Sequence, residues 1–133
     1  MSPIRLFIRS VRHAVSGIFD VARAEQSFRF QIFISIIVFS FALLLPLDTW
    51  ERVLVLLLCS AVMVLEILNS IMERFADAVQ PRLSSMVREI KDMMAGAVFL
   101  TALTAAVIGV MIFYPHFKDL LYVILEKVTQ GGR

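Results

Sequence analysis

Hydrophobic residues along the chain form three long, predominantly apolar runs that are separated by short polar segments. The runs cover about residues 28–45, 53–73 and 93–113. Each run approaches the ~20 apolar residues that a helix needs to cross the hydrocarbon part of a bilayer. The pattern therefore predicts three transmembrane helices, joined by a turn at 46–52 and a polar loop at 74–91.

The segment before the first run has a different periodicity. Within residues 2–23 apolar residues recur every three or four positions, and polar residues follow the same period on the other side. The apolar set is Ile4, Phe7, Ile8, Val11, Ala14, Val15, Ile18 and Ala22, and the polar set is Arg5, Arg9, Arg12, Ser16, Asp20 and Arg23. This pattern predicts an amphipathic helix that lies in the headgroup layer. A helix packed against a soluble partner is the alternative. A short amphipathic tail, residues 116–133, is expected after the third span ends at Tyr114–Pro115.

Composition supports an all-α integral membrane protein and excludes other classes. Hydrophobic residues make up 59% of the 133 residues, against about 45–50% in ordinary soluble domains. A soluble domain of this size could not bury so much apolar surface, because small domains bury the smallest fraction of their chain. The net charge of +2 argues against nucleic acid binding. The single cysteine, Cys59, excludes a disulfide within the chain.

The distribution of basic residues predicts the orientation in the membrane. Five arginines precede or open the first span, whereas the 46–52 turn contains Arg52 alone. The loop at 74–91 contains Arg74, Arg82, Arg88 and Lys91. Because cytoplasmic segments carry the excess of Lys and Arg, the amino terminus and the 74–91 loop are expected in the cytoplasm.

Polar residues gather on one face at the cytoplasmic end of the second span. Glu66 follows the charge-free residues 53–65, at a depth where an ionisable group costs a few kcal/mol and is by default a candidate for function. At 100° per residue, Glu66, Asn69, Glu73 and Asp77 fall within an arc of about 80°. Such a stripe of carboxylates repels itself unless cations complete it.

Residues near this stripe complete the chemistry of phosphoryl transfer. Carboxylates of this kind hold Mg²⁺ together with phosphate oxygens, and Lys91, Asp92 and Glu25 are expected at the same membrane face. The chain has no glycine-rich phosphate loop, so soluble ATPase and protein kinase folds are excluded. A small channel or transporter subunit is the competing class. It would need polar residues along a whole span, yet residues 53–65 offer only Cys59 and Ser60.

Three motifs carry a resemblance to a known family. They are EQSFR at 25–29, EILNSIME at 66–73 followed by Asp77, and KDMMAGA at 91–97; Gly17 also fits. Over about residues 5–116 the sequence resembles the prokaryotic diacylglycerol kinases and their undecaprenol kinase relatives. The resemblance implies one membrane-embedded lipid kinase domain (1–133), a homotrimer with active sites shared between subunits, and a place in the bacterial cytoplasmic (inner) membrane. It also implies transfer of the γ-phosphate of ATP, with Mg²⁺, to a lipid hydroxyl.

The resemblance also implies roles for individual residues. Glu66 matches the general base, Glu25 and Glu73 match the metal-binding glutamates, and Asn69 and Asp77 match supporting polar positions. The implied ATP-binding residues are His13, Glu25, Glu73, Lys91 and Asp92. His13 stands where the family often has tyrosine, and an upstream arginine of the family matches either Arg5 or Arg9. The MAGAV run at 94–98 is closer to undecaprenol kinases. We expect diacylglycerol as the acceptor, giving phosphatidic acid, with undecaprenol as the alternative.

Overall fold

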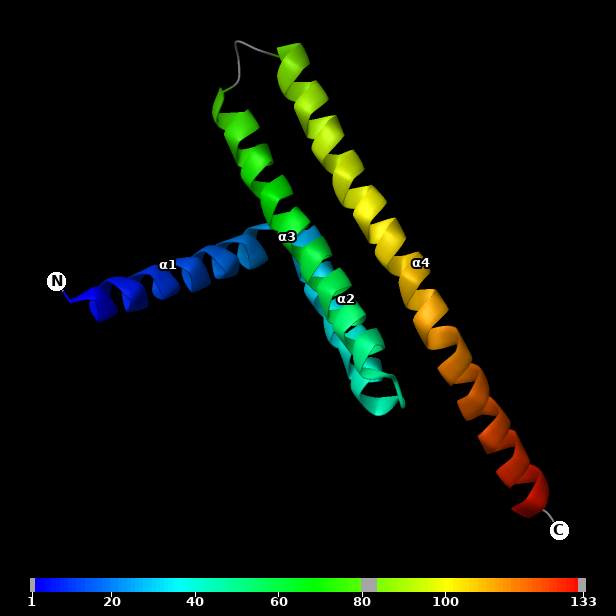
Figure 1. The fold of residues 1–133 in the computed structure, drawn as a ribbon. Coiled ribbons are helices and arrows are strands. Elements are labelled where there is room, and N and C mark those ends of the chain that lie inside the picture. Colours follow the sequence, from blue (N-terminus) through cyan, green and yellow to red (C-terminus); the bar gives the residue numbers. More distant parts are fainter. Residues whose placement is uncertain (1, 80–83, 132–133) are drawn as a thin grey trace.

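The computed structural model describes residues 2–79 and 84–131, and it places them in four helices (Figure 1). These are α1 (Pro3–Ala24), α2 (Gln26–Leu44), α3 (Thr49–Val79) and α4 (Ser84–Gly131). The described ranges contain no strand, so the predicted all-α class is confirmed. Arg82, which entered the prediction of orientation, lies outside the described residues.

Helix α3 is the centre of the arrangement. It packs against α1, α2 and α4, and α1 also contacts α2. Helices α2 and α4 lie along α3, whereas α1 projects away from these three (Figure 1). Helices α2, α3 and α4 each contain a segment that is long and apolar enough to cross a membrane, as the hydrophobic pattern predicted.

A sharp corner at Glu25 separates α1 from α2. Glu25 has extended backbone angles (φ −105°, ψ 121°), so it ends α1 and precedes α2. Val21 and Phe28 are buried on the two sides of this corner. The guanidinium of Arg29 donates hydrogen bonds from Nη1 to the carbonyl oxygens of Ala22 (3.3 Å) and Arg23 (3.0 Å). Since the last carbonyls of a helix have no partner within it, Arg29 caps α1 from the first turn of α2.

The turn between α2 and α3 is held by buried leucines and polar contacts. Leu45 and Leu47 are buried and belong to a small core cluster with Ala42, Val55 and Ile112. Arg52 Nε donates to the carbonyl oxygen of Ala42 at 3.2 Å. This cluster lies at the end of the bundle away from Glu66.

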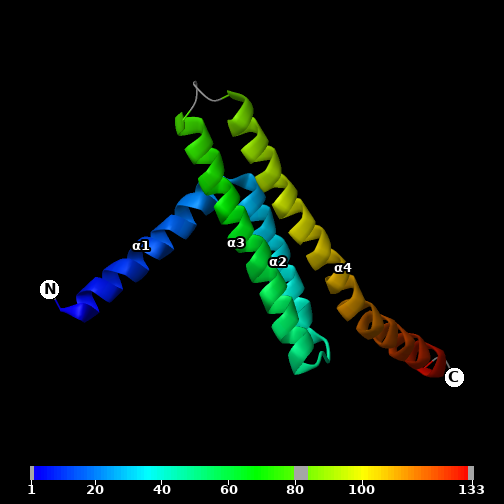
Figure 2. The same cartoon turned by 45° about the horizontal axis from the view of Figure 1, so that its top comes forward.

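Helices α3 and α4 extend beyond the predicted spans. Helix α3 continues past residue 73 and takes in Asp77, which the sequence placed on the same helix face as Glu66, and α4 already contains Lys91. The third span was predicted to end at Tyr114–Pro115, and the helix continues through this point, with Pro115 inside α4. Proline removes one backbone hydrogen bond, and the helical pattern of apolar residues continues on both sides of it. Figure 2 shows the last part of α4, from orange to red, turning away from the direction of the part before it.

Candidate functional site

Glu66 lies on α3 facing the first turn of α2. The residue is only 6% exposed, and Ser70, one turn further along α3, is 3% exposed. The hydroxyl of Ser27 on α2 donates a hydrogen bond to Glu66 Oε2 at 3.3 Å. A buried carboxylate needs such donors because it has lost its hydration. The packing of α2 on α3 therefore places a hydrogen-bonded pair of polar side chains, Ser27 and Glu66, between the two helices.

Glu25 is brought to α3 by the corner between α1 and α2. Its Oε1 lies 3.9 Å from Arg74 Nη2, and its side chain is 27% exposed. Arg74 follows Glu73 directly in the sequence, so the structure places Glu25 beside the part of α3 that carries Glu73. The two glutamates that resemblance assigned to metal binding thus come from neighbouring elements.

Two further polar pairs connect the predicted residues. Asn69 Nδ2 donates a hydrogen bond to Glu73 Oε1 at 3.2 Å, one turn along α3. Lys91 Nζ on α4 lies 3.1 Å from Asp77 Oδ1 on α3. The ion pair between Lys91 and Asp77 joins the end of α3 to the beginning of α4. The predicted gathering of polar groups at one end of the spans is therefore seen for α2, α3 and α4.

His13 and Asp92 are not joined to this group within one chain. His13 is exposed on α1, where Nε2 accepts a hydrogen bond from Arg9 Nε at 3.4 Å. Helix α1 leads away from the bundle (Figure 1). Asp92 is exposed on α4 and lines a shallow hollow with Ser85, Arg88 and Glu89. One chain thus presents the predicted site residues in separate parts.

The carboxylates of Glu25 and Glu73 suit a metal ion that arrives bound to a nucleotide. They suit an ion held by protein side chains alone less well. Among residues 2–79 and 84–131, no three His, Cys, Asp or Glu side chains lie close enough to hold an ion by themselves. Mg²⁺ usually takes one or two carboxylates, with substrate phosphates and water completing its octahedral shell. Glu25 and Glu73, on neighbouring elements, provide donors of this type.

An apolar groove of about 580 Å³ runs between α2 and α4, and it is floored by α3. The α2 wall includes Gln31 and Ser35, which follow Ser27 by one and two turns. The floor includes Val62, one turn before Glu66. Half of the α4 residues that line the groove are small, namely Ala102, Ala105, Ala106 and Gly109. The groove walls therefore continue the helix faces that carry Ser27 and Glu66.

Sequence reasoning missed two residues at this site, Ser27 and Arg74. Ser27 lies within the EQSFR motif, but its role depends on contact with a residue 39 positions away. Arg74 was counted only as a basic loop residue. Helical periodicity places Arg74 about 60° outside the arc of the stripe, and the position of Glu25 beside it follows from the corner between α1 and α2.

Fold and site together define an α-helical multi-pass membrane protein with a buried carboxylate and a cluster of charged groups near one end of its spans. A protein-family model described as prokaryotic diacylglycerol kinase matches residues 12–113. The chain belongs to this family and is a lipid kinase.

Three relatives support this assignment. The chain is 32% identical over 109 residues to the undecaprenol kinase of Bacillus subtilis, covering 82% of this chain and 89% of the relative. It is 30% identical over 113 residues to a diacylglycerol kinase of Synechocystis, covering 84% of this chain and 65% of that longer relative. A diacylglycerol kinase of Pseudomonas aeruginosa is 26% identical over 103 residues, with 76% and 84% covered. One of these relatives is named an undecaprenol kinase and two are named diacylglycerol kinases.

Proposed function

We propose that this protein transfers the γ-phosphate of ATP to the hydroxyl of a membrane lipid, with diacylglycerol as acceptor and phosphatidic acid as product. Membership of the lipid kinase family supports the reaction class. The observation that carries the site is Glu66, a carboxylate only 6% exposed, held by the Ser27 hydroxyl near one end of the spans. The proposed place is the bacterial inner membrane, with the active site on the cytoplasmic side.

In the proposed reaction Glu66 is the general base. Its carboxylate accepts the proton of the lipid hydroxyl while the hydroxyl oxygen forms a bond to the γ-phosphorus. The bond between the γ-phosphorus and the oxygen that bridges it to the β-phosphate breaks, and ADP leaves. Ser27 orients the carboxylate through its hydrogen bond and so acts as a positioning residue.

The remaining predicted residues bind the nucleotide. Glu25 and Glu73 would hold the Mg²⁺ ion that accompanies ATP, since two carboxylates suit an ion that keeps phosphate oxygens in its shell. An ion held there would offset the negative charge of the phosphates. Lys91 is proposed to contact the phosphates. His13 and Asp92, which lie apart within one chain, would complete the nucleotide site across the interface of a homotrimer.

The apolar groove supports a lipid acceptor. It continues the α2 and α3 faces that carry Ser27 and Glu66, and its walls are almost entirely apolar. The apolar chain of the lipid would lie in this groove, in an apolar environment, while the hydroxyl of the same lipid reaches the carboxylate of Glu66. Holding the two reactants in this way removes much of the entropic cost of their encounter.

Helix α1 is proposed to lie in the headgroup layer. Large apolar residues of α1 are exposed, among them Ile4 (71%) and Phe7 (70%). The arginines of α1 alternate with these apolar residues at helical spacing. No apolar partner in the described chain covers this face. A position at the membrane surface would bury the apolar face and place the arginines near lipid phosphates.

Undecaprenol is the second candidate acceptor. It is favoured by the relative from Bacillus subtilis, which is named an undecaprenol kinase and is matched over 89% of its length. Both lipids present a hydroxyl at the membrane surface and an apolar chain, so the same site chemistry serves either.

The experiment that tests the function measures transfer of labelled γ-phosphate from ATP, with Mg²⁺, to diacylglycerol and to undecaprenol. Purified protein in mixed micelles is compared with the variants Glu66→Gln and Glu51→Gln. We expect Glu66→Gln to lower kcat by at least about 100-fold, because general base catalysis supplies rate factors of this size. Glu51 lies at the opposite end of the bundle, near His116, so Glu51→Gln is expected to retain activity.

The ratio of kcat/KM for the two lipids identifies the acceptor. No product with either lipid, from protein shown to be helical and assembled, would contradict the proposed reaction. Full activity of Glu66→Gln would contradict the assignment of the base.

A further inference from the structure

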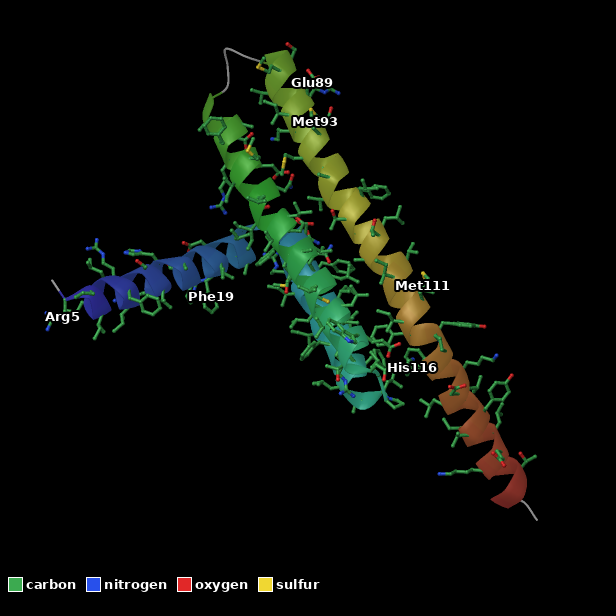
Figure 3. The ribbon with its side chains drawn as sticks, viewed as in Figure 1. Arg5, Phe19, Glu89, Met93, Met111 and His116 are labelled. Carbon is green, nitrogen blue, oxygen red and sulfur yellow. The ribbon has the colours of Figure 1, made fainter. Side chains whose placement is uncertain are left out.

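Helix α4 continues well beyond the end of the α2–α3 pair. At that end His116 Nε2 lies 3.4 Å from Glu51 Oε2, in the first turn of α3. Phe117 packs edge-to-face on Phe41 of α2, with ring centroids 5.4 Å apart. In Figure 3 His116 lies on α4 near the turn between α2 and α3, and the ribbon of α4 continues past it. Residues 116–127, named here the C-terminal surface segment, therefore begin where the bundle ends.

Most apolar residues of the C-terminal surface segment lie on one face. At 100° per residue, five of them cover an arc of about 140°, and Val123, which is 50% exposed, lies about 60° outside this arc. The five are Phe117, Leu120, Leu121, Ile124 and Leu125, with exposed fractions from 41% for Phe117 to 57% for Leu121. Asp119, Tyr122 and Glu126 lie on the opposite side. An apolar face of this size, left in water, would be costly because exposed apolar surface is unfavourable by about 25 cal/mol per Å².

Basic and acidic residues of the segment lie at different distances from this apolar face. Lys118 lies about 20° beyond Leu125 at one border of the face, and Lys127 lies about 20° beyond Leu120 at the other. Asp119 and Glu126 fall in the middle of the polar side. Lys118 Nζ also lies 5.7 Å from the centre of the Tyr122 ring. The positive groups are thus nearest the apolar face and the negative groups farthest from it.

This sorting of charges favours a lipid surface over a second copy of the segment. Lysines at the borders of an apolar face can extend their ammonium groups to lipid phosphates while the stems cover apolar surface. Copies of this chain in one membrane share the same direction, so packed segments would be parallel. Their lysine-bearing borders would then face each other without an acidic residue at either border, so the contact would lack the opposite-charge pairs that favour parallel helix pairing.

We propose that the C-terminal surface segment binds the membrane surface at the face opposite the Glu66 site, and that it prefers anionic lipids. Pro115 lies inside α4 just before the segment, and Figure 2 shows the orange-to-red end of α4 turning away from the direction of the part before it. The apolar face enters the boundary between headgroups and acyl chains. Lys118 and Lys127 contact lipid phosphates, and Asp119 and Glu126 remain in water. The protein would then be attached to both surfaces of the bilayer, by α1 on one side and by this segment on the other.

The test places an environment-sensitive fluorophore on each face of the segment in the full-length protein. In a Cys59→Ser background, single cysteines replace Ile124 on the apolar face and Asp119 on the polar face. The labelled proteins are reconstituted into vesicles of phosphatidylcholine, with and without phosphatidylglycerol. We expect the label at 124 to be quenched by spin-labelled lipid and protected from aqueous iodide, and the label at 119 to show the reverse.

A charge-reversed variant tests the lipid preference. With Lys118→Glu and Lys127→Glu together, we expect the label at 124 to lose the added protection that phosphatidylglycerol provides. The matched variant with Lys118→Arg and Lys127→Arg should keep it. Circular dichroism verifies that each variant remains helical.

Two results would overturn the proposal. Equal quenching by iodide at 119 and 124 would show a segment that extends into water. Protection at 124 that persists in lipid-free detergent and disappears on dilution would show a second copy as the partner.

Discussion

Ser27 illustrates how a single hydroxyl makes a buried carboxylate tolerable. Glu66 has lost nearly all of its exposure to water, and within the described residues no fully buried side-chain nitrogen or oxygen lacks a partner. Hydrogen bonds to charged groups contribute about 1.5–3 kcal/mol, more than bonds between neutral groups. The hydroxyl of Ser27 therefore compensates part of the cost of burying Glu66.

Replacing Ser27 with alanine tests its role as a positioning residue. We expect Ser27→Ala to lower kcat roughly tenfold, because the lost hydrogen bond to a carboxylate corresponds to about 1.4 kcal/mol or more. Steady-state kinetics with saturating lipid and ATP measure this, and Ser27→Thr should restore most of the rate. Ser40→Ala is the matched control, since the Ser40 hydroxyl bonds the carbonyl oxygen of Ile36 within α2. An unchanged kcat for Ser27→Ala would remove Ser27 from the site.

The ion pair between Lys91 and Asp77 gives a prediction on nucleotide affinity. We expect Lys91→Met to raise KM for MgATP about tenfold or more, because the variant lacks the positive charge that is proposed to face the phosphates. Asp77→Asn should have a smaller effect, since Lys91 keeps its charge without the 3.1 Å partner. Initial rates over a range of MgATP concentrations measure both variants. A larger loss in Asp77→Asn than in Lys91→Met would assign nucleotide binding to the carboxylate.

At this scale the sequence predicts local pairs better than distant ones. Asn69 and Glu73 are four residues apart on one helix, so their hydrogen bond follows from helical geometry. The bond between Ser27 and Glu66 joins different helices and requires the register of α2 against α3. That register is set by packing, which no single motif records.

The corner at Glu25 is the element on which the position of α1 depends. Arg29 caps the last turn of α1 by hydrogen bonds to two carbonyl oxygens, and Glu25 lies beside Arg74 of α3. These contacts connect α1 to both neighbouring helices. The angle between α1 and the bundle is therefore fixed by polar contacts as well as by the packing of Val21 and Phe28.

Replacing Arg29 should loosen this corner. We expect Arg29→Gln to shift the balance between α1 positions by roughly 1 kcal/mol, about fivefold in population, because two exposed hydrogen bonds are lost. Spin labels at Ser16→Cys on α1 and Ser60→Cys on α3, in a Cys59→Ser background diluted with unlabelled protein, would report a broader distance distribution. Arg23→Gln, in the last turn of α1, is the control, because the side chain of Arg23 is not needed for the hydrogen bond that its carbonyl oxygen accepts. Identical distributions in all three proteins would show that packing alone sets the angle.

The existence of the helices was predictable, but their ends were not. The three apolar runs predicted three helices, because a segment that crosses lipid must satisfy its backbone hydrogen bonds internally and therefore forms a helix. The sequence pattern placed Asp77 on the same helix face as Glu66, and α3 includes it, whereas the pattern did not show that α4 continues as a helix through Pro115. Charged residues can extend a helix beyond the apolar part, and a proline removes one bond from a long helix that many others maintain.

The molecule as a whole exposes more surface than a soluble protein of its mass. Its accessible surface is 10429 Å², whereas a compact monomer of 15.1 kDa would expose about 7,000 Å². The excess consists largely of apolar side chains on the three spans. Lipid and neighbouring copies are what can cover this surface, so the isolated chain in water is not the functional unit.

Mixing inactive variants tests whether copies share a site. If His13 and Asp92 complete the nucleotide site of a neighbouring subunit in a homotrimer, Glu66→Gln and Asp92→Asn should each be inactive or nearly so. Assembled together they should regain a fraction of wild-type activity, because some sites then contain both intact residues. Light scattering in detergent measures the mass of the assembly. No recovery from verified mixed assemblies would indicate that each chain forms its site alone.

Helix α2 is much shorter than the other two spans. Its 19 residues are about 28 Å long at 1.5 Å per residue, and contacts at both of its ends leave it little freedom to lengthen or slide. In a thicker bilayer, α3 and α4 still reach both surfaces, whereas lipid around α2 must thin to meet it, at a cost of a fraction of a kcal/mol per Å. Membrane thickness therefore acts on this protein through one helix, and that helix carries Ser27 at the site.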